Sequence, residues 1–457
     1  MIIDCKQYDG VCACGKGHHV VTRLAVIEAG CLTQFEAYMD MLGLTERRAV
    51  VYDEQTYQAK GLVRPAAQQE IILPGQDLCA NERAVATVLQ ALRADTDVLV
   101  AVGGGTLHDI VRYCGHKLRL PFVACPTAAS VDGYASGICS MTLEGVQTKV
   151  SATAPVLVLA DVDVLASAPE RLTAAGLGEA LGKFTTLTDW RVANLLMRED
   201  ACPAAEAMIL QAAVAAQGCG AALSQRDAGA VAQLMYALLL SGIAAQMMAP
   251  YRPASASEHH LAYLMDLMPG PLGIGRPLLH GEKIGVSTLV AAEVYQRLAR
   301  IDDITPYVKA YKPLERAWLA QQFGKTTGAA LAAENTPDVL EQVDMRRFIA
   351  KWESIRRIIR EMPDVTALKD ALRSAGAVSS TAEIGITEQK IPKMLELAPC
   401  TRNRLTLLRM LRVLKFRYTN GASRLAFGGK RYGDKAMARS GGKGAAGMNS
   451  AGQSTPG

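Results

Sequence analysis

The stretch VLVAVGGGTLHDIVRYC, residues 98–114, decides the fold. It begins with an apolar run, which predicts a buried strand, and passes through three glycines into a helical pattern that opens at Thr106. Glycine lets the backbone approach a bulky anion, and a helix N-terminus offers free N–H groups and a positive dipole end. The stretch therefore predicts a pyrophosphate site at the carboxyl end of a strand, with a plain tight turn as the alternative.

Similar apolar runs lie on both sides of this stretch and alternate with helical patterns. One helical pattern, NERAVATVLQALRAD at 81–95, has Asn81 as its expected N-cap. The alternation is typical of a parallel sheet buried between helices, so we predict an α/β nucleotide-binding domain over residues 1–165. The other predicted strands are AVVYD (49–53), EIIL (70–73), PFVACPT (121–127) and PVLVLAD (155–161).

After Asp161 the pattern changes to long helices, beginning with SAPERLTAAGLGEALGKFTTLTDWRVANLLM, where Pro169 stands at a helix start. We place the boundary near Ala166 and predict a mostly helical domain over residues 166–418. The remaining residues, 419–457, are rich in Gly, Ser, Ala and Lys and predict a disordered basic tail.

The uncharged stretch at 228–251 is long enough to span a bilayer. It contains Gln233, Ser241 and Gln246 and leads into a polar loop with histidines, which favours a buried core helix and no membrane. Eleven cysteines and a start without a basic segment and apolar run favour a reduced, cytoplasmic protein.

Composition excludes two classes of protein. A chain of 457 residues that is half hydrophobic and one fifth charged is neither a stapled mini-protein nor globally disordered. The net charge of +5 comes from residues 401–443, which hold twelve Lys and Arg against one acid, Asp434. The segment RNRLTLLRMLRVLKFRYT within it predicts an amphipathic basic helix. Any binding of nucleic acid would rest on this segment alone, so we expect no nucleic-acid partner.

The cysteines Cys12 and Cys14 lie close together as CAC and are followed by His18 and His19. This grouping suggests a zinc site. The spacing lacks the usual two-residue gap, and no second cysteine pair follows, so an N-terminal hairpin lined with thiols is the favoured interpretation.

The strand at 121–127 leads into the loop CPTAASVDGYAS, which carries Thr127, Ser130, Asp132 and Ser136. Small hydroxyls with one carboxylate suit a cofactor phosphate or ribose and a polyol substrate, and a structural turn is the alternative. Farther along, Glu179 in GLGEALGK, His259 in SASEHHLAY and His280 in LLHGEKIG offer a carboxylate and two imidazoles. Such a set suits Zn, Fe or Ni with positions open to substrate, although single buried histidines are commonly structural.

Taken together, GGGTLHD, PTAASVDGYAS, AGLGEALGK, RPASASEHH and LHGEKIG, in this order, resemble the sn-glycerol-1-phosphate dehydrogenase family. That family lies within the group of iron-containing alcohol dehydrogenases, glycerol dehydrogenases and dehydroquinate synthases. The resemblance covers about residues 10–415. It implies a Rossmann-like domain followed by a helical metal-binding domain, with NAD or NADP and one divalent metal between them. It also implies a reaction that interconverts dihydroxyacetone phosphate and sn-glycerol 1-phosphate.

The resemblance assigns roles residue by residue. Glu179, His259 and His280 would hold the metal, and Asp132 would touch the substrate. Lys183, one turn beyond Glu179, is a candidate contact for a substrate phosphate, with a solvated helix lysine as the alternative. The residues implied in cofactor binding are Asp53, Gly103, Gly104, Gly105, Thr106, Leu107, His108, Asp109, Thr127, Ala128, Ala129, Ser130 and Ser136.

Two positions depart from the family pattern. Glu179 stands where the family usually has Asp, so the carboxylate is one methylene longer. Tyr263 stands where relatives have a histidine that contacts substrate or relays a proton, and a phenol with an ordinary pKa of about 10 relays protons poorly near neutral pH. His260 is a possible substitute. Asp53 favours NAD over NADP, because a carboxylate near the ribose repels a 2′-phosphate.

The expected chemistry is hydride transfer at the nicotinamide, with the metal as Lewis acid. Three alternatives remain. A glycerol or polyol dehydrogenase on the same fold is favoured by Tyr263. A dehydroquinate-synthase-like lyase would use NAD only transiently and would not accumulate NADH. A non-enzymatic relative would bind anions through its basic C-terminal segment. We also expect a homodimer, because the helical domain offers apolar surface.

Overall fold

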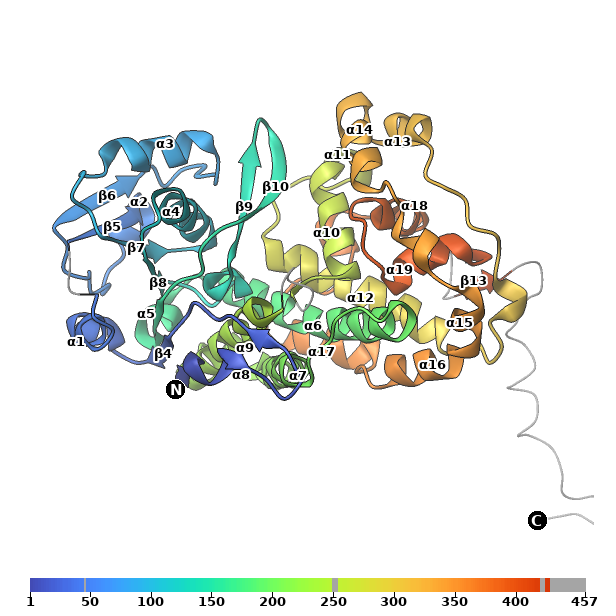
Figure 1. Cartoon of the computed structure of the whole chain (residues 1–457), viewed down its shortest axis with the longest axis horizontal. Coiled ribbons are helices and arrows are strands. Elements are labelled where there is room, and N and C mark those ends of the chain that lie inside the picture. The colour runs from blue at the N-terminus through green and yellow to red at the C-terminus, as the bar shows by residue number, and fades with distance from the viewer. Residues whose placement is uncertain (45–46, 249–253, 420–423, 428–457) are drawn as a thin grey trace, which may run out of the picture.

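The structure is a computed structural model that describes residues 1–44, 47–248, 254–419 and 424–427. A sheet with helices on its faces forms one end of the molecule, and helices form the other end (Figure 1). The strand order in the main sheet is β1-β4-β11-β8-β7-β5-β6. Its strands are β1 (Ile2–Asp4), β4 (Leu24–Glu28), β5 (Arg48–Asp53), β6 (Gln69–Leu73), β7 (Val98–Gly103), β8 (Phe122–Pro126) and β11 (Leu157–Asp161).

The five predicted strands are confirmed as β5, β6, β7, β8 and β11, and all neighbours among them pair in parallel. Strand β7 is buried along its whole length, as a strand covered on both faces should be. Gly103 at the end of β7 pairs with Pro126 at the end of β8. The glycine turn and the loop after β8 therefore begin at the same edge of the sheet.

The sheet also contains strands that were not predicted. Strand β4 (LAVIE) pairs in parallel with β11. Strand β1, at the edge of the sheet, pairs with β4 in antiparallel fashion. The hairpin of β9 (Ile138–Leu143) and β10 (Val146–Ser151) projects between the sheet and the helices (Figure 1). A short N-terminal hairpin joins β2 (Gly10–Val11) to β3 (Gly17–His18), as predicted for the region around Cys12 and Cys14.

Helices cover the sheet and build the second half of the described chain. Asn81 caps α3 through the amide of Ala84, as predicted. The helices of the first half are α1 (Phe35–Met41), α2 (Glu54–Tyr57), α3 (Glu82–Ala91), α4 (Gly105–Leu118) and α5 (Val162–Ser167). Those that follow are α6 (Glu170–Met197), α7 (Pro203–Gln217), α8 (Gly220–Ser224), α9 (Ala228–Met247), α10 (Ser257–Leu267), α11 (Pro269–Leu272), α12 (His280–Leu298), α13 (Arg316–Phe323), α14 (Lys325–Glu334), α15 (Met345–Ala350), α16 (Trp352–Arg360), α17 (Val365–Ser374), α18 (Ile391–Leu397) and α19 (Leu407–Met410).

Residues 228–247 of the uncharged stretch form α9, which lies inside the protein. It is the one helix of the described chain that is long and apolar enough to cross a membrane, and 78% of its most apolar 18-residue stretch is buried inside the protein. Its polar residues serve internal contacts. Gln246 donates to the Thr22 hydroxyl and to the Ala135 carbonyl, and accepts from the Val21 amide. The prediction of a core helix is confirmed.

The predicted basic helix near the C-terminus is wrong. Only α19 and a turn of 3-10 helix at Leu411–Val413 form there, followed by strand β12 (Phe416–Thr419). Arg409 is fully buried and its guanidinium binds Asp338 at 2.7 Å, so this charge supports the core and faces no partner. The predicted tail lies mostly outside the described residues. Of its described residues, Thr419 ends strand β12, and Arg424–Phe427 form strand β13, which pairs with β12.

Candidate active site

Three side chains from three helices meet beside the sheet. Glu179 lies in the middle of α6, His259 in the first turn of α10, and His280 is the first residue of α12. One donor atom from each lies within 4.8 Å of the other two. His280 Nε2 is 3.3 Å from Glu179 Oε2, and His259 Nε2 is 4.0 Å from Glu179 Oε1.

Glycines allow these helices to approach closely. A Cβ on Gly178 would lie 2.3 Å from the carbonyl oxygen of Gly281, and a Cβ on Gly281 would lie 1.8 Å from that of Ala175. No side chain fits at either position without moving backbone. The sequence AGLGEALG therefore brings α6 against the start of α12, which places Glu179 beside His280.

The three residues fit a divalent metal. Glu179 is completely buried, and its Oε2 atom has no hydrogen-bond partner among the described residues, which is costly unless a cation fills the gap. Burial raises the pKa of Glu179, but Lys183 and His259 together hold it below its ordinary value, so the carboxylate is charged. Burial, with His259 and Lys283, lowers the pKa of His280 well below its usual range and keeps the imidazole neutral. A carboxylate and neutral imidazoles are the donors that Zn, Fe and Ni bind.

A second carboxylate, which was not predicted from the sequence, orients His259. Glu258 is fully buried and accepts from His259 Nδ1 at 2.7 Å and from the hydroxyls of Thr185 and Thr186. Because the hydrogen bond to Glu258 uses Nδ1, the other ring nitrogen, Nε2, faces Glu179. Carboxylates commonly orient metal-binding histidines in this way. The one signal in the sequence was the pair Glu258 and His259, which spacing rules do not single out.

Lys183 joins Glu179 to Asp132. Its ammonium lies 2.8 Å from Asp132 Oδ2, 2.8 Å from Glu179 Oε1 and 2.9 Å from the Ala254 carbonyl. These three acceptors use all three donors of the buried ammonium. In this arrangement the ammonium has no donor left for a substrate phosphate, so the contact suggested for Lys183 stays a prediction. The alternative of a solvated helix lysine is wrong, because the side chain is fully buried and positions two carboxylates. Ser241 of α9 also donates to Asp132 Oδ2, at 3.1 Å.

The glycine turn sits at the N-terminus of α4. Gly104 caps the helix, and a Cβ there would meet nothing within 4 Å, whereas a Cβ on Gly103 would lie 2.6 Å from Leu107 Cδ2. The amides of Gly105, Thr106 and Leu107 begin the helix and have no partner within it. The turn thus presents open backbone at a positive helix end, which suits a diphosphate.

Thr106, directly after the turn, is exposed, whereas the next three side chains make contacts inside the protein. Leu107 is 1% exposed, and His108 is buried with Nδ1 on the Gly104 carbonyl. Burial lowers the pKa of His108 to about 3, so its ring is neutral. Asp109 binds Arg112 at 2.7 Å and accepts from the Ser140 amide. Among Leu107, His108 and Asp109, only backbone is available at this turn for a cofactor.

The remaining predicted cofactor residues lie at the same sheet edge. The Thr127 amide donates a hydrogen bond to the Gly103 carbonyl. A Cβ on Gly176 would lie 1.9 Å from the carbonyl oxygen of Ala129. Helix α6 therefore packs directly against the loop that holds Ala128 and Ala129. The hydroxyls of Ser130 and Ser136 are used locally, on Tyr134 and on the Ile138 amide. Asp53 at the end of β5 caps α2 through Thr56, and its Oδ2 would lie 3.1 Å from a Cβ on Gly103.

Two cations gather around Tyr263. The guanidinium of Arg402 lies 4.5 Å from the ring centroid, and the ammonium of Lys149, from β10, lies 6.0 Å from it. Burial raises the pKa of Tyr263, but Lys149 and Arg402 outweigh it and lower the pKa below its ordinary value. Neither cation was singled out from the sequence, because β10 was not predicted and Arg402 was assigned to a basic helix. The cations make this side of the site attractive to an anion.

Comparisons with known proteins agree with this architecture. Residues 26–169 match the family model described as iron-containing alcohol dehydrogenase. A glycerol-1-phosphate dehydrogenase [NAD(P)+] from Geobacillus stearothermophilus is 31% identical over 89% of this chain and 96% of that protein. One of the same name from Bacillus licheniformis is 29% identical over 89% and 93%. The crystal structure of a probable glycerol dehydrogenase from Sinorhizobium meliloti 1021 superposes with a TM-score of 0.54 and 21% identity, covering 84% of this chain and 90% of that one.

Proposed function

Because the chain belongs to the glycerol-1-phosphate dehydrogenase family, we propose that it interconverts dihydroxyacetone phosphate and sn-glycerol 1-phosphate by hydride transfer with NAD(P). The observation that carries the proposal is the buried donor set of Glu179, His259 and His280. It lies on helices that pack against the loop at the carboxyl edge of the sheet, where the glycine turn also begins. A metal and a nicotinamide that meet there would suit a metal-dependent alcohol dehydrogenase.

Glu179, His259 and His280 would hold the metal, which when bound supplies a Lewis acid for the oxygen of the alcohol or ketone. Glu258 keeps His259 in the tautomer that presents Nε2. Lys183 bridges Glu179 and Asp132, offsets one of their two negative charges and fixes their orientation. We assign Asp132, held by Lys183 and Ser241, to contact with a substrate hydroxyl.

We assign the substrate phosphate to Lys149 and Arg402. Both cations lie against the ring of Tyr263, and Tyr263 belongs to α10, the helix that also carries His259. An anion held by the two cations would therefore lie on the metal side of the site. Arg402 suits a phosphate through its planar set of donors, and Lys149 supplies a point charge. Tyr263 has a lowered pKa in this setting, which makes the phenol a better proton donor than an ordinary tyrosine.

We assign the cofactor diphosphate to the turn of Gly103, Gly104 and Gly105 and the first amides of α4. The backbone of Thr106, Leu107, His108 and Asp109 and the loop residues Thr127, Ala128, Ala129, Ser130 and Ser136 complete this assignment. Asp53 lies beside Gly103, on the adenosine side of the proposed site. Its carboxylate favours NAD, although relatives are named for both cofactors.

A glycerol or polyol dehydrogenase is the second candidate. It is favoured by Tyr263 in place of the expected histidine, and it is opposed by Lys149 and Arg402, which an uncharged polyol would leave without a counter-ion. The assay that separates the two is NAD(P)H oxidation by the metal-loaded protein with dihydroxyacetone phosphate, run beside dihydroxyacetone. The proposal expects turnover of the phosphorylated ketone that is lost in Glu179→Gln. Turnover of dihydroxyacetone alone would favour the second candidate.

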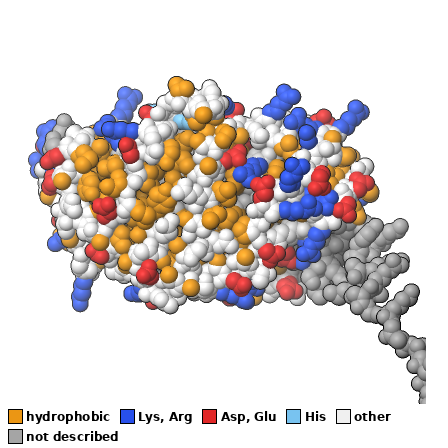
Figure 2. Space-filling view, turned by 90° about the horizontal axis from the view of Figure 1, so that it is seen from below, with side chains coloured by type: hydrophobic (Ala, Val, Ile, Leu, Met, Phe, Trp, Pro, Cys, Tyr) orange, Lys and Arg blue, Asp and Glu red, His pale blue; other side chains and the backbone are white. Residues whose placement is uncertain are grey.

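The assembly and location of the protein also belong to the proposal. Figure 2 shows hydrophobic side chains gathered in a broad band on the face seen from below. Leu210 and Val214, one turn apart on α7, are 38% and 55% exposed, so apolar surface is available for a homodimer. Light scattering on wild type and Val214→Lys tests this. All eleven cysteines are free thiols, which suits a reducing cytoplasm.

A further inference from the structure

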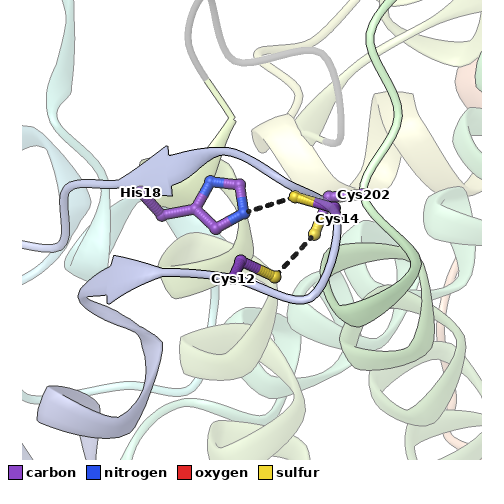
Figure 3. Close-up of side chains that lie close together, drawn as sticks. All are labelled: Cys12, Cys14, His18 and Cys202. Atoms are coloured by element: carbon purple, nitrogen blue, oxygen red, sulfur yellow. Dashed lines mark hydrogen bonds between the residues drawn. The ribbon is translucent and has the colours of Figure 1, made fainter.

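We propose that the chain binds a second, structural zinc ion through Cys12, Cys14, His18 and Cys202. Their donor atoms all lie within 4.8 Å of one another, and the group shares no residue with the donors of the proposed active site. Figure 3 shows the four side chains pointing toward one another. This inference does not depend on the proposed function.

The distances match a tetrahedral ion. Bonds of about 2.3 Å to sulfur and about 2.0 Å to nitrogen place neighbouring sulfurs about 3.8 Å apart, and sulfur and nitrogen about 3.5 Å apart. In the structure Cys12 Sγ lies 3.7 Å from Cys202 Sγ, and Cys14 Sγ lies 3.3 Å from His18 Nε2. Two edges of the tetrahedron are therefore close to the required lengths before any ion enters.

His18 is held in the orientation that a ligand needs. It is buried, and its Nδ1 lies 2.7 Å from the carbonyl oxygen of Met247 at the end of α9. Because a carbonyl only accepts, Nδ1 carries the proton and Nε2 presents its lone pair to the sulfurs. Such a bond at the second ring nitrogen is the usual support of a metal-binding histidine.

The backbone around the cysteines is shaped for the site. The Gly15 amide donates to the Cys12 carbonyl, and the Cys12 amide donates to the Lys16 carbonyl. These two hydrogen bonds close a tight turn around Cys14. Gly15 has φ +83°, a conformation that favours glycine. Cys202 is the N-cap residue of α7, a 15-residue helix whose start places this thiol 3.7 Å from that of Cys12. His19 takes no part: it is exposed and pairs with Asp9.

Three thiolates and one imidazole form the closed donor set of a structural zinc site. Binding releases one proton from each of the three thiols and leaves the zinc centre with a single negative charge. The ion would join the N-terminal hairpin to Cys202, which is 190 residues farther along the chain, and through His18 to the end of α9. An ion pair between Lys16 and Asp200 already joins the same segments. We therefore expect zinc to fasten the N-terminal hairpin to the helical half.

The test uses the full chain loaded with Co²⁺ in place of zinc. Thiolate ligands give a charge-transfer absorption that a site of one carboxylate and two imidazoles does not give. We expect this absorption in wild type, in Glu179→Gln and in Cys79→Ser, a control at an exposed cysteine outside the cluster. We expect a marked reduction in Cys202→Ser, which removes one thiolate, and weaker Co²⁺ binding at this site in His18→Ala, which keeps the thiolates but removes the imidazole.

Metal analysis of the zinc-purified protein provides a second measurement that does not depend on a variant folding well. Chelation of wild type should remove a zinc ion whose release frees three thiols to a thiol reagent and lowers the melting temperature, and added zinc should restore it. Absence of the charge-transfer absorption in Co²⁺-loaded wild type would overturn the proposal. So would a Cys12–Cys202 disulfide that forms in the purified protein while it retains no zinc at this position.

Discussion

His280 Nε2 lies 3.3 Å from Glu179 Oε2, an oxygen that is fully buried and has no hydrogen-bond partner in the described part of the chain. The close approach follows from the backbone contact of Gly178 with Gly281. A buried carboxylate oxygen left in this way beside a neutral imidazole is the clearest structural indication of a metal in the molecule.

The contact of Glu258 with His259 should determine how tightly the metal is held. The variant Glu258→Gln keeps the size of the side chain but removes the charge that fixes the imidazole at Nδ1. We expect the metal dissociation constant to rise by about 10- to 100-fold, the usual effect of losing such a support. Competition with a chelator measures it, and Glu293→Gln, on α12, is a control. An unchanged affinity would mean that Glu258 does not orient the ligand.

Lys183 should matter for stability as well as for activity. Lys183→Met leaves the buried carboxylate of Glu179 and the half-buried carboxylate of Asp132 without their shared cation. We expect the metal-free protein to lose about 3 to 5 kcal/mol of unfolding free energy in urea. Lys149→Met removes an exposed lysine and should change stability little. Equal stabilities of the two variants would contradict the role given to Lys183.

Lys149 and Arg402 should determine preference for a phosphorylated substrate. We expect Lys149→Met and Arg402→Ala each to raise KM for dihydroxyacetone phosphate about 10-fold or more, because a charge-assisted contact is worth about 1.5 to 3 kcal/mol. KM for dihydroxyacetone should change much less, since that ketone has no phosphate. Steady-state kinetics on both substrates test this. A parallel loss on the two ketones would place these cations outside the phosphate site.

Gly281 should tolerate no side chain. Gly281→Ala would place a methyl group 1.8 Å from the Ala175 carbonyl oxygen, so α6 and α12 must separate. We expect a loss of about 1 to 3 kcal/mol in stability and weaker metal binding, because Glu179 and His280 move apart. The matched control is Gly275→Ala, where a Cβ meets nothing within 4 Å. Denaturation midpoints and metal affinity that equal those of wild type would contradict the packing argument.

The ion pair of Asp338 with Arg409 predicts a dependence of stability on pH. Burial raises the pKa of Asp338, but Arg409 and Arg412 outweigh it, so the folded-state pKa lies below the unfolded one. Its contribution is therefore complete above the unfolded pKa, about 3.9, and is lost as pH falls through the folded pKa. The variant Asp338→Asn should lack the part of the fall in unfolding free energy at low pH that comes from protonation of Asp338. Urea midpoints of wild type and Asp338→Asn, measured from pH 7 to pH 3, test this. Midpoints that fall in parallel for the two proteins would contradict the prediction.

The sheet was predictable because its central strands are continuous apolar runs bounded by turn residues, as in β7 and β8. Strand β10 was not, because its alternating polar residues, Gln147 and Lys149 among them, resemble a loop. The basic C-terminal helix was wrong for a related reason. Charge periodicity indicated a solvated face, while Asp338, far away in sequence, brings Arg409 into the core.

The candidate site was predictable where a local motif carried the side chain, as for Glu179 and His280. Partners from distant segments were not. Cys202 has no neighbour in sequence that suggests a metal ligand, and it reaches Cys12 and Cys14 only through the fold. The contact of Lys183 with Glu179 follows from their spacing on one helix, but its contacts with Asp132 and Ala254 do not, because no spacing rule connects those residues to it.

The most direct test of the central claim is the identity of the product formed from dihydroxyacetone phosphate and NAD(P)H by the metal-loaded protein. We predict oxidation of the cofactor and a glycerol phosphate that an enzyme specific for sn-glycerol 3-phosphate does not consume. A product that such an enzyme consumes completely, or no product while the protein binds metal and nucleotide, would contradict the assignment.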